Sequence, residues 1–169
     1  MSAKIIAFGG VSNSGKTTLI EKILEKYSNT FSFFAIKHDP KNKAVFDDAK
    51  KDSAKFFQAG ADVCITSSEK SAIFLHQEQN IYDLCKKFDD KDFILIEGFK
   101  MLQCPRICVA RKEIFLDEIK NSHAIALDSI KILEGINFQG KILNLEDIEG
   151  IFEWISCHAK TLRELEWKK

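Results

Sequence analysis

The sequence predicts an α/β fold in which helices cover both faces of a mostly parallel, twisted sheet. Short, near-continuous apolar runs recur along the chain, as expected for parallel strands that are buried on both faces. Stretches with helical character separate these runs, and this alternation is typical of a doubly wound sheet. A glycine-rich loop at Gly10–Thr17 joins the first apolar run, Ile5–Phe8, to the first helical stretch.

The order of elements follows from these patterns. The predicted strands are six apolar runs, at Ile5–Phe8, Phe33–Ile36, Val63–Thr66, Phe93–Ile96, Ile107–Ala110 and Ala124–Leu127. The predicted helices are Lys16–Tyr27, Asp52–Ala59 ended by Gly60, Asn80–Phe88 and a long final segment, Asn144–Glu166. A further strand at Ser71–Gln77 is expected to form a hairpin with Val63–Thr66.

The loop at Gly10–Thr17 reads Gly-Val-Ser-Asn-Ser-Gly-Lys-Thr, the pattern of a phosphate-binding P-loop. Its glycines let successive backbone amides converge on an anion at a helix N-terminus. We therefore expect a P-loop NTPase in which Lys16 contacts the β- and γ-phosphates as a catalytic residue, Thr17 binds Mg²⁺ and Thr18 donates to the α-phosphate. The nucleotide-binding residues expected in this loop are Gly10, Ser12, Asn13, Ser14, Gly15, Lys16, Thr17 and Thr18. The alternative, an ordinary glycine turn, is disfavoured by the strand before it and the helix after it.

A carboxylate follows the predicted strand Phe93–Ile96, at the end where an open α/β sheet binds its ligands. We expect Glu97 to be the catalytic carboxylate that binds Mg²⁺ or orients the attacking water. Gly98 would then allow close approach to the γ-phosphate and join the nucleotide-binding residues. The alternative is a solvated Glu followed by a glycine turn.

Three polar residues, Lys37, His38 and Asp39, follow the predicted strand Phe33–Ile36. Their place beside the expected nucleotide site makes Lys37 and Asp39 candidate nucleotide-binding residues. Metal or substrate binding and a plain polar turn before Pro40 are the alternatives for the triplet, since a lone His is seldom a ligand.

Composition narrows the classes of partner. The chain has 169 residues with 45% hydrophobic content and without linkers, repeats or low-complexity tracts, so residues 1–169 are expected to form a single P-loop nucleotide-binding domain. Its 25 basic and 25 acidic side chains cancel, which does not favour binding to nucleic acid or to a membrane.

Five cysteines without a CxxC pair, in a chain without a secretory signal, predict reduced thiols and a cytoplasmic location. Cys104 and Cys108 could supply two metal ligands, but the sequence lacks the further close-spaced ligands that a tetrahedral site needs.

The motifs, taken in order, resemble the molybdopterin-guanine dinucleotide biosynthesis adapter family, MobB, over most of the chain. They are the P-loop with Thr18, Lys37–Asp39, Lys51–Ser53, Ala59–Gly60, Glu97–Lys100, and Pro105–Ile107 followed by Arg111. The chain departs from the family pattern at Pro40 and Lys41, where the family often has histidines. It departs again at Phe56 and Phe57, where basic residues are common.

This resemblance implies a GTP-binding adapter with weak GTPase activity. The adapter would assist the guanylyltransferase that attaches GMP to molybdopterin, with GTP and Mg²⁺ as cofactors. Its implied partners are molybdopterin or its guanine dinucleotide, the guanylyltransferase, and a second copy of the chain in a homodimer. Guanine specificity rests on the resemblance, and Asp128, after Ala124–Leu127, is the candidate contact to the base.

The alternative function is that of a P-loop small-molecule kinase, which would transfer a phosphoryl group from ATP or GTP. Such kinases usually close an arginine-rich lid over the nucleotide. This chain has few arginines and no long insert to form a lid, so the sequence favours the adapter.

Overall fold

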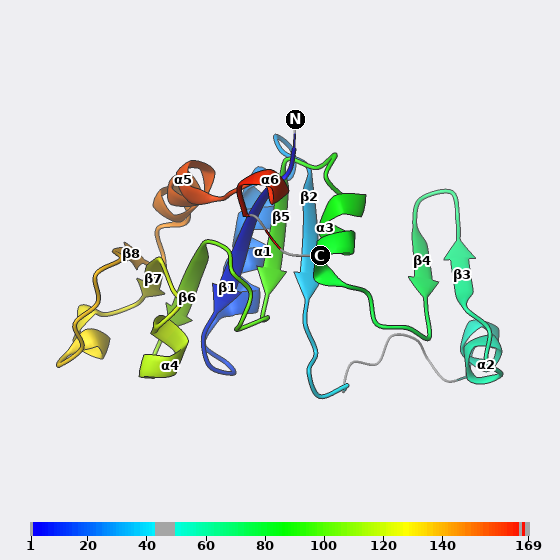
Figure 1. The fold of residues 1–169 in the computed structure, drawn as a ribbon, viewed down its shortest axis with the longest axis horizontal. Helices are drawn as coiled ribbons and strands as arrows, with labels where there is room; N and C mark the ends of the chain where they lie inside the picture. Colours follow the sequence, from blue (N-terminus) through cyan, green and yellow to red (C-terminus); the bar gives the residue numbers. More distant parts are fainter. Residues whose placement is uncertain (1, 43–49, 166, 168–169) are drawn as a thin grey trace. The chain divides into compact units, whose positions relative to one another are not determined.

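The computed structural model describes residues 2–42, 50–165 and 167 of the chain. The chain divides into two compact units, one made of residues 1–38 and 82–169 and the other of residues 39–81. Each unit has its own sheet (Figure 1).

The larger unit contains a six-stranded sheet with the strand order β2-β5-β1-β6-β7-β8. All of its strand pairs are parallel, which confirms the predicted parallel sheet. The strands are β1 (Lys4–Gly9), β2 (Phe33–Lys37), β5 (Phe93–Glu97), β6 (Arg106–Ala110), β7 (Ala124–Leu127) and β8 (Lys141–Asn144). Because β2, β5 and β1 are neighbours, the segments that follow these three strands meet at one edge of the sheet.

Helices cover both faces of this sheet, as predicted. In β6 the successive residues Ile107 and Cys108 belong to two different buried clusters, because neighbouring side chains of a strand point to opposite faces. The Ile107 cluster includes residues of α1 (Lys16–Tyr27) and α5 (Ile148–His158). The Cys108 cluster includes residues of α4 (Leu116–Ile119) and of the 3₁₀ helix η1 (Ile130–Leu133). Among the described residues, this unit also contains nearly all of α3 (Ile81–Lys87), which lies beside β2 in Figure 1, and α6 (Leu162–Leu165).

The long final helix predicted at Asn144–Glu166 was wrong in its extent. Asn144 is instead the last residue of β8, an edge strand that the sequence prediction missed. Helix α5 ends at His158, because Ala159 takes an extended conformation with ψ 143°. Lys160 then forms an antiparallel bridge with Ile5 of β1, so that tertiary pairing with the central strand interrupts the helical pattern.

The smaller unit contains α2 (Asp52–Gln58) and an antiparallel hairpin of β3 (Val63–Thr66) and β4 (Ser71–Phe74). The hairpin was predicted, and its register pairs Val63 with Phe74 and Thr66 with Ser71. The expectation that Val63–Thr66 is also a strand of the doubly covered parallel sheet was wrong. Only the first residue of β3 is buried, and a short apolar run does not by itself distinguish a central strand from an exposed hairpin strand.

Candidate functional site

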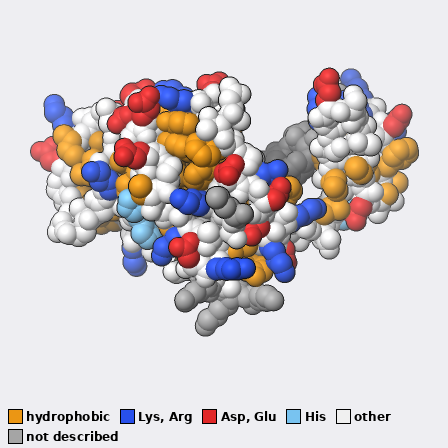
Figure 2. All heavy atoms as spheres, turned by 90° about the horizontal axis from the view of Figure 1, so that it is seen from above, with side chains coloured by type: hydrophobic (Ala, Val, Ile, Leu, Met, Phe, Trp, Pro, Cys, Tyr) orange, Lys and Arg blue, Asp and Glu red, His pale blue; other side chains and the backbone are white. Residues whose placement is uncertain are grey.

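Basic and acidic side chains are interspersed over the face of the molecule shown in Figure 2. On that face, charge of one sign does not gather into a broad surface. The amide-rich loop at the end of β1 lies on the opposite side, at the lower ends of the strands in Figure 1, and binding of a highly charged ligand there would depend on local geometry.

The loop between β1 and α1 has backbone conformations that require glycine at two positions. Gly10 has φ 126°, and a Cβ there would lie 2.4 Å from the carbonyl oxygen of Val109. Gly15 has φ 98°, and a Cβ there would lie 2.7 Å from Nε of Arg111. A side chain on either of these two residues is thus disfavoured in the tight curl that the P-loop pattern predicted.

The ammonium group of Lys16 lies inside this curl. Its Nζ donates to the carbonyl oxygens of Gly10 at 2.8 Å and Val11 at 2.7 Å. Burial lowers the pKa of Lys16 below its ordinary value, while the carboxylates of Glu97 and Glu118 partly oppose that shift. The loop therefore combines a partly buried cation with the N-terminus of α1, an arrangement suited to binding an anion.

The hydroxyl of Thr17 and the carboxylate of Glu97 come together at the start of α1. Thr17 Oγ1 donates to Glu97 Oε1 and Oε2 at 3.2 and 3.1 Å. Neighbouring oxygen ligands of an octahedral Mg²⁺ lie about 2.9 Å apart at its usual bond lengths, so these two groups could share one ion with little movement. The pair fits Mg²⁺, which prefers oxygen ligands and usually takes few of them from protein.

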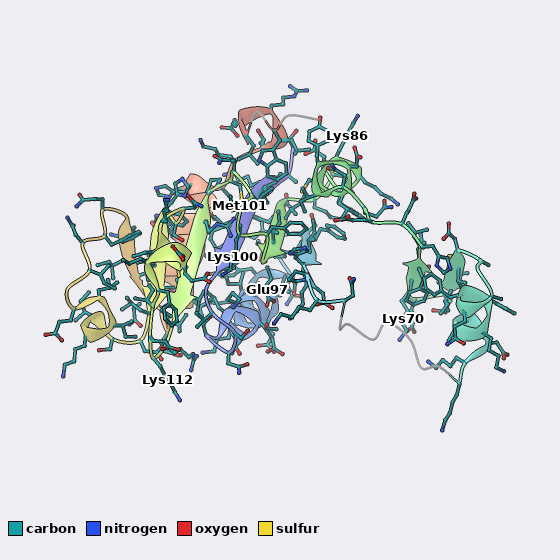
Figure 3. All side chains as sticks on the ribbon, turned by 60° about the horizontal axis from the view of Figure 1, so that its bottom comes forward. Lys70, Lys86, Glu97, Lys100, Met101 and Lys112 are labelled. Atoms are coloured by element: carbon teal, nitrogen blue, oxygen red, sulfur yellow. The ribbon has the colours of Figure 1, made fainter. Side chains whose placement is uncertain are left out.

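Lys37 is the third member of this group. The parallel register places it opposite Glu97 across β2 and β5, and its Nζ lies 3.4 Å from Glu97 Oε1. Glu97 also lies at the end of β5 beside the start of α1, as Figure 3 shows. The ends of β1, β2 and β5 were predicted to converge. The segments at these strand ends therefore contribute charged groups to the same edge of the sheet, beside the phosphate loop.

The turn after Glu97 closes this edge of the site. Gly98 has φ 97°, and its amide donates to the carbonyl of Phe8 in β1 at 3.1 Å. A Cβ at Gly98 would lie 3.1 Å from Cβ of His38, so the two segments approach closely. The ring of His38 stacks on Phe99 with a centroid distance of 4.0 Å.

Together these segments line a cleft of about 620 Å³. Its lining residues are Gly10, Ser12, Asn13, Ser14, Gly15, Lys16, Thr17, Thr18, Lys37, His38, Glu97 and Gly98. All but His38 were predicted to bind nucleotide or metal, and the structure brings them together in the larger unit.

Two predicted residues lie elsewhere. Asp128 follows β7, two strands away from β1 in the sheet, and is not among the residues that line the cleft. Asp39 is the first residue of the smaller unit, where its carboxylate accepts from the amide of Lys41 at 3.2 Å. Contact of either residue with a nucleotide remains a prediction.

Cys104 and Cys108 are buried. Burial raises the pKa of their thiols to about 11 and about 12, respectively. The thiolate forms that bind metals are therefore disfavoured in this structure, and both side chains pack as part of the interior.

The structure also reveals polar residues near the cleft that sequence reasoning did not single out. Glu118 of α4 accepts from the amide of Gly10 at 3.2 Å and forms an ion pair with Lys100. Arg106 is buried beneath the turn after Glu97. A charged residue at the start of an apolar run was a visible signal for Arg106, whereas the sequence around Glu118 offered none.

A Gly-x₄-Gly-Lys-Thr loop between the central strand of a parallel sheet and a following helix defines this chain as a P-loop NTPase by fold. The chain belongs to the MobB family: the family model described as molybdopterin guanine dinucleotide synthesis protein B matches residues 5–129. The resemblance inferred from the ordered motifs is thereby confirmed.

Individual relatives agree with this assignment. The molybdopterin-guanine dinucleotide biosynthesis adapter protein of Haemophilus influenzae is 34% identical over 115 residues, which cover 64% of this chain and 64% of that protein. The probable adapter protein of Bacillus subtilis is 31% identical over 134 residues, covering 73% of this chain and 74% of the relative. The crystal structure of Bacillus subtilis MobB has the same fold, with a TM-score of 0.71 at 23% identity, covering 92% of this chain and 98% of that one. The aligned segment thus spans less than two thirds of the Haemophilus relative.

In the part of the chain that the structure describes, no helix combines the length and the apolar character needed to cross a membrane.

Proposed function

We propose that this protein binds GTP together with Mg²⁺ and acts as an adapter in molybdenum cofactor biosynthesis. In this proposal it hydrolyses GTP weakly and assists the guanylyltransferase that attaches GMP to molybdopterin. The observation that carries the nucleotide part is the meeting of Lys16, Thr17 and Glu97 in one cleft. The pathway and the guanylyltransferase come from the family, because relatives of this chain are molybdopterin-guanine dinucleotide biosynthesis adapter proteins.

Each group in the cleft has a defined part in the proposed binding. The loop amides and Lys16 would hold the phosphates, and Thr17 and Glu97 would hold Mg²⁺, which supplies positive charge to the β- and γ-phosphate oxygens. Glu97 would also orient the attacking water. Lys37 already lies close to Glu97 and would add a further positive charge beside the phosphates.

The contact to the base, the pairing of two chains and the cellular location complete the proposal. Asp128 is the proposed contact to guanine, because it directly follows β7, whose carboxyl end lies on the same edge of the sheet. Residues 1–169 would act as one nucleotide-binding domain, and the chain would pair with a second copy, as the family resemblance implies. A cytoplasmic location is supported by the five unpaired cysteines.

The test is titration with a fluorescent GTP analogue, with and without Mg²⁺, using the wild type and Lys16→Ala. Loss of a charge-assisted contact to phosphate corresponds to about 1.5–3 kcal/mol, so affinity should fall by about tenfold to a hundredfold. Lys26→Ala is the matched control, because Lys26 lies on the same helix but pairs with Glu149 at 2.6 Å, outside the cleft. Equal affinity of wild type and folded Lys16→Ala would contradict the assignment.

Competition with unlabelled GTP and ATP then tests the base preference. Slow GTP hydrolysis by the isolated protein, changed when guanylyltransferase and molybdopterin are added, is the expected behaviour of an adapter. Fast phosphorylation of a metabolite by this chain alone, with no association with the guanylyltransferase, would support the kinase alternative instead.

A further inference from the structure

Arg106, the first residue of β6, is 2% exposed, although arginine is rarely buried unless it is paired. Its guanidinium donates hydrogen bonds to three backbone carbonyl oxygens, all in the segment that follows Glu97. Nη1 donates to Gly98 at 3.2 Å, and Nη2 donates to Phe99 at 2.7 Å and to Leu102 at 3.1 Å. One side chain therefore satisfies three acceptors of a single turn.

This turn has a backbone that needs external support. Gly98 and Phe99 both have positive φ values, 97° and 51°. The left-handed region is unfavourable for a residue with a side chain such as Phe99, and such conformations persist where the surroundings fix them. Arg106 binds the carbonyls of both residues, so it opposes relaxation of the turn to a more ordinary conformation.

The same side chain lies against the end of β1, directly before the phosphate loop. Arg106 lies opposite Ala7 in the β1–β6 register, and a Cβ at Gly9 would lie 3.4 Å from its Cδ. The stem of Arg106 thus packs against the last residue of β1 while its guanidinium holds the turn after Glu97. An apolar residue of similar size could fill this space but could not donate to the three carbonyls.

A positive charge here is costly to bury. Burial lowers the pKa of Arg106 from its ordinary value, which reflects the loss of water around the guanidinium. Its Nε is buried without a hydrogen-bond partner among the described residues. Burial of a charge is tolerated when hydrogen bonds compensate it, and the three carbonyls of the turn supply them.

We propose that Arg106 is a positioning residue for the phosphate cleft: it holds the Gly98–Leu102 turn from inside the protein and thereby fixes Glu97 and Gly98 beside the phosphate loop. That Arg106 holds the turn is inferred from the contacts of Arg106 alone. The effect on Mg²⁺ binding rests in addition on the proposed function. Lys100, within this turn, forms an ion pair with Glu118, which also accepts from the amide of Gly10.

The experiment compares Arg106→Met, Arg106→Lys and the control Arg163→Met, which removes an exposed arginine of α6. The first measurement is amide hydrogen exchange at Gly98 and Leu102, whose amides donate to the carbonyls of Phe8 and Phe99. In Arg106→Met these amides should exchange about tenfold faster or more, while amides of α1 keep the wild-type rate. Arg106→Lys, which keeps a donor, should show a smaller increase, and the control should show none.

The second measurement is the affinity for a fluorescent GTP analogue with Mg²⁺ and with EDTA. Arg106→Met should bind within about twofold of wild type in EDTA, where the phosphate loop acts alone. The factor by which Mg²⁺ raises the affinity should be about tenfold smaller in Arg106→Met than in wild type. Arg106→Lys should recover part of this loss. A purely structural role would instead lower both affinities together.

The outcomes separate the two proposals. Unchanged exchange at Gly98 and Leu102 in folded Arg106→Met would overturn the positioning role, and so would faster exchange with an unchanged effect of Mg²⁺. If Arg106→Met does not fold, Arg106→Lys is judged by the same two criteria. If the wild type binds no nucleotide, the proposed function fails, and the exchange rates still decide whether Arg106 holds the turn.

Discussion

Replacing Glu97 by Gln tests the charge of one carboxylate, because Gln keeps the size of the side chain and one acceptor oxygen. In the structure this carboxylate accepts from Thr17 at 3.1 and 3.2 Å and lies 3.4 Å from Nζ of Lys37. A hydrogen bond to a charged group contributes about 1.5–3 kcal/mol. Since 1.4 kcal/mol corresponds to about a factor of ten, the loss of one charged ligand should weaken the Mg²⁺-dependent part of nucleotide binding by about tenfold to a hundredfold.

The assay measures two quantities for each variant: nucleotide affinity with Mg²⁺ and with EDTA, and release of inorganic phosphate from GTP. Glu97→Gln should bind at least as tightly as wild type in EDTA, because it removes a negative charge next to the triphosphate. Its affinity with Mg²⁺ and its hydrolysis rate should both fall. Glu153→Gln is the matched control, since Glu153 is exposed on α5.

One result would refute the reasoning. If folded Glu97→Gln keeps both the full effect of Mg²⁺ on affinity and the wild-type rate of hydrolysis, Glu97 is neither the metal ligand nor the hydrolytic carboxylate. The approach of Thr17 to Glu97 would then be a structural contact between α1 and β5.

Two further predictions concern the phosphate loop. Gly10→Ala should lower the free energy of unfolding by about 2–5 kcal/mol, because its Cβ would meet the Val109 carbonyl at 2.4 Å and its φ is 126°. Gly135→Ala, at φ 76° with nothing within 4 Å, should cost only about 1–2 kcal/mol in the same urea titration, and equal costs would contradict the predicted clash. Nucleotide affinity should fall as the pH rises through the lowered pKa of Lys16, below its ordinary 10.5, because the complex retains a proton that the free protein loses. Lys16→Ala should bind weakly with less dependence on pH over that range, and an equally steep fall in this variant would assign the titration to another group.

The parts of the fold that depend on local pattern were predictable. Buried parallel strands read as apolar runs, and a Gly-x₄-Gly-Lys-Thr loop carries its own conformation because its glycines admit positive φ values. The end of β5 was predicted to bring Glu97 beside the loop, since ligands bind at the carboxyl ends of strands in such sheets. The structure has Glu97 within hydrogen-bond distance of Thr17.

Elements that depend on pairing with distant parts of the chain were not predictable. Strand β8 has a single buried residue, so its sequence carries little of the apolar signal of the central strands. The end of α5 coincides with the bridge between Lys160 and Ile5, which are far apart in the sequence. The hairpin of β3 and β4 was recognised, but its separation from the parallel sheet was not visible in its short apolar runs.

By itself, the sequence determined the class of sheet, the phosphate loop and the family, because each of these is encoded in residues that lie close together or in a fixed order along the chain. Only the tertiary structure decided that Arg106 serves the turn after Glu97 and that Glu118 contacts Gly10. These contacts join residues of different elements, and their existence follows from which strands become neighbours. The physical reason is that burial and hydrogen bonding are properties of the packed chain, so a charged residue in the sequence shows its partner only when the sheet has formed.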